Sequence, residues 1–172
     1  MFHVRDATMA DLNRLVAFSL ALAEKTAGRQ LCRNTVTAGV QRLLNDRSLG
    51  FILVAETRRG RVIGELMVGG REWDEWSNGE FWWITSLCVL PSWMGKGVER
   101  ALYSRAEKIA QQSAVSVLGL RACVLTTNQW AREVLAPAVG SNWNGYLVFE
   151  SRLGVESSGV GAEPGAAADS GA

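Results

Sequence analysis

The segment Leu87–Leu102 has the residue types and spacing to bind a phosphate group. An apolar run ends at Pro91, two glycines follow at Gly95 and Gly97, and an amphipathic stretch begins at Val98. The first backbone N–H groups of a helix have no intrahelical acceptor and lie at the positive end of the helix dipole. Glycine lets such a turn approach a ligand closely. The natural guest of this pattern is a phosphate or pyrophosphate.

Two common phosphate-binding motifs are excluded at this place. Lys96 is not followed by the Ser or Thr of a P-loop at the required spacing, and the GxGxxG of a dinucleotide site is incomplete. An isolated Gly-x-Gly is also compatible with an ordinary strand-to-helix turn. The residues around the glycines therefore decide between the two interpretations.

Those residues form a longer pattern, Leu87-x-Val89-x-Pro91-x-Trp93-x-Gly95-Lys96-Gly97-Val98, followed by Ala101-Leu102. This run resembles the acetyl-CoA motif of the GNAT superfamily of N-acetyltransferases. The resemblance extends over roughly residues 2–150, and the most similar branch is that of diamine-type and other small-molecule acetyltransferases. It implies that acetyl-CoA is the cosubstrate, without a metal, and that a primary amine of a small molecule or peptide attacks its thioester directly. It also allows a homodimer.

The resemblance implies which residues hold acetyl-CoA. The backbone of Leu87, Cys88 and Val89 would pair with the pantetheine arm, and Asn128 would help to place it near the thioester. The pyrophosphate would lie on the turn made by Met94, Gly95, Lys96, Gly97, Val98 and Glu99.

Four positions depart from the family pattern. Met94 replaces an Arg or Gln, and Glu99 stands where a small residue is usual. We expect Glu99 to point outward, because its carboxylate would repel a pyrophosphate while favouring the helix dipole. Thr85 stands where related diamine acetyltransferases often have a glutamate. Leu135 stands where the family usually has the tyrosine that acts as general acid.

Acetylation requires the amine to lose a proton, and general acid–base help contributes on the order of 10²–10⁴ in rate. The candidate catalytic residues are Thr85, Glu80 and Tyr146. The base would be a water held by Thr85 or Ser86, or one of the carboxylates around the preceding loop; Tyr146 would be the acid. These candidate carboxylates are Glu72, Asp74, Glu75 and Glu80. The alternative function is an acetyl-CoA-binding protein with weak or lost catalysis, in a regulatory or sensor role.

Acidic and aromatic residues alternate between residues 71 and 76, a composition that suits a cationic amine through ion pairing and cation–π contact. The candidate acceptor-binding residues are Trp73, Asp74, Glu75, Trp76 and Trp83. A solvated turn with tryptophan anchors is an equally good interpretation, and Trp82 and Trp83 suit core packing. Glu56, Glu65 and Glu107 are expected to be surface or sheet-edge charges, Tyr103 to pack, and the three cysteines to be small core residues.

Composition limits the remaining function classes. The chain has 172 residues, a net charge of +1, three Cys and one His. No global field favours nucleic acid or a membrane surface, and neither a disulfide framework nor a multi-histidine metal site can be assembled. The N-terminus lacks the layout of a secretory signal, so we expect a cytoplasmic protein.

The elements that must position these residues follow from periodicity and turn signals. We expect a strand over 2–5, a helix from the Thr8-x-x-Asp11 start, and a second helix capped by Asn34 or Thr35. A hairpin over 50–57 and 61–69, a loop over 70–79, and a strand over 81–90 follow. A long helix from Val98, a strand over 115–125, a helix over 128–135 and a strand over 146–150 complete the order.

This order predicts one α/β domain over residues 1–152. Its sheet would be mixed and mostly antiparallel, with about six to seven strands and helices on both faces. Residues 153–172 are rich in Gly, Ala and Ser and have little apolar surface to bury. We expect them to be a disordered tail.

Overall fold

A computed structural model describes residues 1–122 of the chain. The strands are β1 (Phe2–Asp6), β2 (Phe51–Thr57), β3 (Val62–Asp74), β4 (Gly79–Val89) and β5 (Val117–Ala122). The helices are α1 (Leu12–Ala27), α2 (Arg33–Asn45) and α3 (Val98–Gln111), with short 3-10 turns at Met9–Asp11 and Pro91–Trp93. The elements predicted over 128–135 and 146–150, the domain boundary at 152 and the tail all lie outside the described residues.

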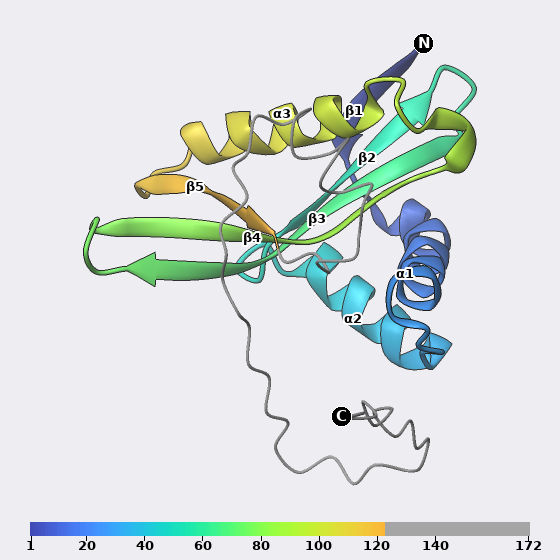
Figure 1. Cartoon of the computed structure of the whole chain (residues 1–172), viewed down its shortest axis with the longest axis horizontal. Helices are drawn as coiled ribbons and strands as arrows, with labels where there is room; N and C mark the ends of the chain where they lie inside the picture. Colours follow the sequence, from blue (N-terminus) through green and yellow to red (C-terminus); the bar gives the residue numbers. More distant parts are fainter. Residues whose placement is uncertain (123–172) are drawn as a thin grey trace, which may run out of the picture.

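The five described strands form one sheet in the order β1-β2-β3-β4-β5 (Figure 1). The first four strands are antiparallel to their neighbours, and β5 is parallel to β4. The parallel pair is joined through α3, because a parallel connection must cross back over the sheet. The predicted mixed, mostly antiparallel sheet is therefore confirmed.

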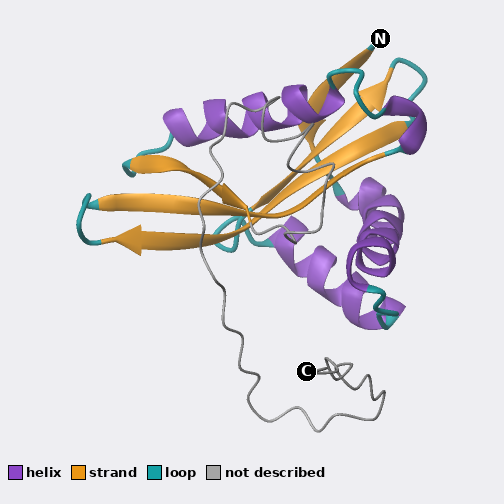
Figure 2. Ribbon diagram, in the orientation of Figure 1, coloured by secondary structure: helices purple, strands orange, loops and turns teal. Residues whose placement is uncertain are grey.

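The sheet carries helices on both faces, as predicted (Figure 2). α3 covers one face, where Val98, Leu102 and Ala106 pack against Leu53, Leu66 and other buried side chains of the central strands. α1 and α2 cover the opposite face. There Leu15, Val16 and Val40 pack on side chains that alternate with the first set, including Val54 and Met67. The two-residue period of strands produces these two separate cores.

The first helix begins where the sequence predicts. The backbone N–H of Thr8 donates to the Asp11 carboxylate at 2.8 Å, as the Thr-x-x-Asp spacing suggests. The same carboxylate accepts two bonds from Arg5 of β1, at 2.8 and 2.9 Å. Arg5 also donates to Glu56 of β2 at 2.8 Å. These partly buried ion pairs of Arg5 connect the first two strands with the start of α1.

The loop predicted over residues 70–79 is wrong. β3 continues to Asp74 and β4 begins at Gly79, so that only residues 75–78 turn. Bulky side chains face each other across the two strands, with Glu72 opposite Phe81 and Trp73 opposite Glu80. Such cross-strand pairs stabilise extended backbone. The polar composition of the segment does not indicate this pairing. The result is a long hairpin that projects beyond the body of the sheet (Figure 1).

Candidate active site

The turn between β4 and α3 lies where the glycine spacing predicts it. Gly95 and Gly97 adopt left-handed φ angles of 70° and 80°. α3 begins at Val98, directly after Gly97. Within residues 1–122, a Cβ built on either glycine meets no atom within 4 Å beyond its chain neighbours. The left-handed backbone therefore favours glycine, and no described residue fills the space beside the turn.

The turn leaves part of its backbone available to an anion. Met94 and Lys96 donate their N–H groups within the turn, to Leu90 O at 3.2 Å and Trp93 O at 3.3 Å. The N–H groups of Gly97, Val98 and Glu99 belong to the helix cap and first turn, where no intrahelical acceptor is in reach. These three amides are the structural basis for an anion site.

The predicted orientation of Glu99 is wrong. Its side chain is 4% exposed, and Oε1 accepts a hydrogen bond of 3.2 Å from the Gly95 N–H. The left-handed glycines fold the turn back toward the first turn of α3, which brings this donor to the carboxylate. The charge-assisted hydrogen bond and the positive end of the helix dipole offset the free-energy cost of burying this carboxylate. The carboxylate of Glu99 therefore binds one of the amides expected to hold the pyrophosphate.

The other side chains of the turn serve different purposes. Met94 packs against the α3 core, in place of the polar residue that the family pattern carries. Trp93 stacks edge-to-face with Phe2 at 6.2 Å between ring centroids. Lys96 is exposed, with Nζ 5.7 Å from the Trp93 ring. It adds a mobile positive charge beside the amides.

β4 changes register within the predicted site. Met67 of β3 pairs with Ser86, whereas Val68 pairs with Ile84, so Thr85 is the extra residue of a bulge. Thr85 is exposed, and its Oγ1 lies 3.4 Å from Met67 O as a weak donor. The bulge re-aims the side chains that follow it. Ser86 and Cys88 consequently face α1 and α2.

The backbone predicted to contact the pantetheine arm has one occupied edge. Leu87, Cys88 and Val89 pair with Leu66, Glu65 and Gly64 of β3. Pairing between β4 and β5 covers Glu80 to Ile84 and, within residues 1–122, stops there. The described part of the chain therefore leaves the second edge of residues 87–89 unpaired.

The prediction of Glu65 as a surface or edge charge is also wrong. Glu65 lies in the middle of β3 and is 0% exposed. Its Oε1 accepts a 2.5 Å hydrogen bond from Ser86 Oγ, and its Oε2 is buried with no partner among the described residues. Burial raises the pKa of this carboxyl from 4.5 to about 7, and the Ser86 bond partly opposes the rise. Sequence reasoning missed this residue, although a lone charge inside the apolar run 62–68 was the available signal.

The carboxylates proposed as bases near the hairpin are bonded to neighbouring side chains. Glu80 accepts from the indole N–H of Trp82 at 3.1 Å. Glu72 accepts from the Trp83 indole at 2.8 Å and from Arg121 of β5 at 3.0 Å. Trp82 is buried in the α3 core, as predicted, and Tyr103 packs against the same core.

The remaining acceptor candidates lie at the hairpin turn. Trp73 is 56% and Trp76 92% exposed, and the Asp74 carboxylate accepts from the Ser77 N–H at 3.0 Å. The strand from Gly79 to Ser86 spans about 20 Å at roughly 3.3 Å per residue. The turn is therefore remote from the bulge. Asn128, Leu135 and Tyr146 lie outside the described residues.

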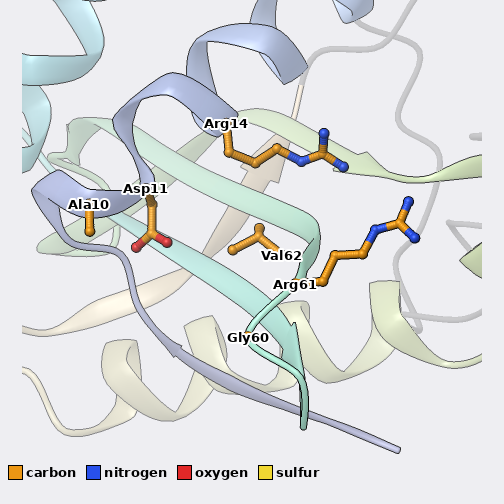
Figure 3. A pocket seen from close by; sticks show the side chains of 6 residues that line it. All are labelled: Ala10, Asp11, Arg14, Gly60, Arg61 and Val62. Atoms are coloured by element: carbon orange, nitrogen blue, oxygen red, sulfur yellow. The ribbon is translucent and has the colours of Figure 1, made fainter.

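A shallow pocket lies elsewhere, between the start of α1 and the β2–β3 turn. Figure 3 shows that the side chains of Arg14 and Arg61 both extend away from Asp11 in this pocket. None of its lining residues belongs to the predicted cofactor or acceptor sets. Within residues 1–122, no cluster of three metal-ligating side chains is found, and no described helix has the length and apolar character to cross a bilayer.

The fold and the turn together define an α/β domain in which a central strand leads through a glycine turn into a helix whose first amides lack intrahelical acceptors. Comparison with known families identifies it. The model of the acetyltransferase (GNAT) family matches residues 17–137, well over half of the chain. The chain therefore belongs to the GNAT acetyltransferase family. No curated protein matches it.

Solved structures agree with the family assignment. A possible acetyltransferase from Clostridium difficile 630 is 27% identical, with a TM-score of 0.76 over 89% of this chain and 98% of that one. The aminoglycoside acetyltransferase meta-AAC0020 from an uncultured soil metagenomic sample, in complex with sisomicin, is 15% identical, with a TM-score of 0.69 over 88% and 96%. AAC(6')-Iy with a CoA-linked bisubstrate analogue is 15% identical, with a TM-score of 0.70 over 88% and 98%. The last two similarities concern the fold.

Proposed function

We propose that this protein transfers the acetyl group of acetyl-CoA to a primary amine of a small molecule or peptide. The observation that carries the proposal is the turn at the start of α3. Left-handed Gly95 and Gly97 open that turn, and the amides of Gly97, Val98 and Glu99 lack intrahelical acceptors. Such a turn suits the pyrophosphate of acetyl-CoA.

The position proposed for the pyrophosphate determines the direction in which the rest of acetyl-CoA would run along the protein. The pantetheine arm would run from the turn back along β4, from Val89 to Leu87, using the edge unpaired in the described residues. Its sulfur would then lie beyond Leu87, next to Thr85 and Ser86. The bulge at Thr85 thus marks the place where we expect the thioester. A neighbouring structure contains AAC(6')-Iy with CoA, which supports this cosubstrate.

The proposed chemistry is direct attack by the amine on the thioester carbonyl carbon. Positioning of the two reactants supplies most of the acceleration, since the thiolate is a good leaving group. Thr85 is placed to orient the reactants, and Tyr146 is retained as the proposed acid. Glu80 is less well placed than Thr85, because it lies near the hairpin turn and its carboxylate holds Trp82.

The acceptor is proposed to be a cationic amine. Aminoglycoside acetyltransferases are among the structural neighbours, and one is in complex with sisomicin. The hairpin residues Trp73, Asp74, Glu75 and Trp76, with Trp83 further along β4, offer carboxylates and aromatic faces to such a molecule. Trp83 lies two residues before Thr85 and is therefore the member of this set nearest to the expected thioester, whereas the hairpin turn suits only an acceptor that spans about 20 Å.

Titration calorimetry with acetyl-CoA and a CoA-thiol release assay test the proposal. The assay would cover sisomicin, spermidine, amino acids and a peptide with a free N-terminus. Gly97→Asp should abolish acetyl-CoA binding, because it places a carboxylate at the phosphate position. Gly97→Asn is the matched control, since Asn has the same size and tolerates the same left-handed backbone. Equal affinity of the two variants would refute the pyrophosphate position.

A second function, acetyl-CoA binding without turnover, is favoured by one observation. Thr85 stands where related enzymes often carry a catalytic glutamate, and a hydroxyl is a much weaker base than a carboxylate. Thermal stabilisation by acetyl-CoA without acetylation of any amine in the panel would support this regulatory or sensor role.

A further inference from the structure

The proposed acetyl transfer gives no role to the buried carboxyl of Glu65. It lies on β3 opposite Cys88, so it is next to the part of β4 that we assign to the pantetheine arm. A fully buried carboxyl in the centre of a sheet costs stability unless it is neutral or paired. Its only hydrogen bond among the described residues is the one from Ser86.

Ser86 connects this carboxyl with the expected reaction site. The serine is half-buried, follows the bulge residue Thr85, and precedes Leu87. Its Oγ lies 2.5 Å from Glu65 Oε1. The thioester is expected beyond Leu87, so the Ser86 hydroxyl is the described group best placed to meet an amine that approaches from the face of α1 and α2.

We infer that Ser86 and Glu65 form a two-residue proton relay that deprotonates the acceptor amine. This inference rests on the proposed function. Ser86 contacts the amine, and Glu65 acts through it as a buried proton acceptor and positioning residue. In this chain the relay takes the role of the glutamate that related enzymes often have at the position of Thr85.

The proton balance of the relay is complete. The ammonium gives one proton to Ser86 Oγ while the Ser86 hydroxyl proton passes to Glu65 Oε1. The neutral amine then forms the C–N bond with the thioester carbon, and the C–S bond breaks. The surplus proton on nitrogen goes to the departing thiolate. Glu65 finally returns its proton to solvent through Ser86.

The surroundings of Glu65 suit a base that works near neutral pH. Burial raises its pKa to about 7, and a general base is most effective when its pKa is near the working pH. The titratable neighbour on β4 is Cys88, whose own pKa burial raises to about 11. From α1, Lys25 and Arg14 lower the Cys88 pKa slightly, while α2 contributes apolar side chains to this core.

Steady-state kinetics of full-length variants test the relay. Glu65→Gln keeps the size of the side chain and an acceptor for Ser86, but it cannot take a proton. It should lower kcat/KM about 10²-fold for the fastest amine of the panel. The relay predicts that wild-type activity falls as pH drops below about 7, and this loss should be absent in Glu65→Gln. Ser86→Ala should give a similar loss, Ser86→Thr should restore most activity, and Glu107→Gln on α3 is the unchanged control.

Hydroxylamine separates a relay from a purely structural role, because it is already neutral at pH 7 and needs no base. After subtraction of the uncatalysed reaction, Glu65→Gln should transfer acetyl to hydroxylamine within about threefold of the wild type, since only the base contribution is lost. Equal losses with hydroxylamine and with the ammonium acceptor would overturn the relay. So would wild-type pH profiles for Glu65→Gln or Ser86→Ala.

Failure of the proposed function gives a different result. A wild type that acetylates neither the amines nor hydroxylamine overturns the transferase activity and the relay together. In contrast, an active wild type with unaffected Glu65 and Ser86 variants overturns the relay alone. Calorimetry with acetyl-CoA on each variant should give unchanged affinity, because neither side chain lies in the pyrophosphate turn.

Discussion

The carboxylate of Glu99 accepts a hydrogen bond from the backbone N–H of Gly95, with 3.2 Å between the two atoms. Both residues belong to the turn that we assign to the pyrophosphate. A bound anion would compete with this carboxylate for the same amide and would be repelled by it at close range. Glu99 therefore stabilises the free turn and opposes the ligand.

Glu99→Gln should consequently bind acetyl-CoA about tenfold more tightly than the wild type, which corresponds to roughly 1.4 kcal/mol. Removal of the charge at the helix start should at the same time lower the free energy of unfolding by about 0.3–1 kcal/mol. Calorimetry and chemical denaturation measure the two effects. Glu107→Gln, a carboxylate on the same helix, should change neither. Weaker binding in Glu99→Gln would show that the carboxylate supports the ligand.

Glu65 predicts an unusual dependence of stability on pH. Its pKa is 4.5 when exposed and about 7 in the fold. The folded state therefore binds more protons between these values, and stability should fall as pH rises from about 4.5 to above 7. The full difference is roughly 3 kcal/mol. Glu65→Gln should remove this slope in denaturation series from pH 5 to 8, whereas Glu75→Gln at the exposed turn should keep it. An unchanged slope in Glu65→Gln would contradict the assignment.

Asp11 should make the stability of the fold depend on pH in the opposite direction. The Arg5 guanidinium holds the pKa of this carboxyl below its usual value of 3.8, with further hydrogen bonds from Thr8. The stability that it contributes is therefore present above pH 3.8 and lost as pH falls through the lower folded value. Asp11→Asn should lower the free energy of unfolding by about 1–3 kcal/mol at pH 7. Glu24→Gln on the exposed side of α1 is the control. Equal stability of the two variants would rule out a contribution from the Arg5 pair.

Gly64 determines how closely α3 docks on the sheet. A Cβ at this position would lie 3.1 Å from Cys88 O, Val89 Cγ2 and Val98 Cγ1. Gly64→Ala should destabilise the protein by about 1–3 kcal/mol through overpacking. It should also weaken acetyl-CoA binding, because Val98 opens the helix that carries the amides. Gly39→Ala in α2, where a Cβ meets no atom of the described residues within 4 Å, should instead stabilise by about 0.5–1 kcal/mol. Thermal melts and calorimetry of both variants check these signs.

Substitution of Trp76 tests acceptor binding separately from packing. Because its side chain is 92% exposed, Trp76→Ala should leave the melting temperature unchanged. If the hairpin binds a cationic acceptor, the same change should raise KM for sisomicin or spermidine severalfold with kcat preserved, as expected for lost cation–π contact. Trp82→Ala, in the core, should cost about 3–5 kcal/mol. An unaltered KM in Trp76→Ala would leave the hairpin turn without a binding role.

The sequence predicted those features that depend on neighbours along the chain. The glycine spacing at 95 and 97 predicted a turn at this place, and the apolar period after it predicted α3 from Val98. Thr8 and Asp11 predicted the start of the first helix in the same way. These signals are local, because a helix cap and a tight turn are each decided within a few residues.

Composition misled where distant residues decide the outcome. The polar composition of segment 70–79 predicts a loop, but pairing of Trp73 with Glu80 across the hairpin makes most of it strand. The bulge at Thr85 leaves no mark in either strand alone, because it is a mismatch between β3 and β4.

The sequence by itself determined an α/β domain of the GNAT family and the place of the glycine turn that precedes α3. Tertiary structure alone decided that Glu65 is buried against Ser86 and that Glu99 turns back to Gly95. The physical reason is that a carboxylate has no fixed environment in a sequence. Its solvation, partners and pKa are set by strands and turns that meet it only after folding.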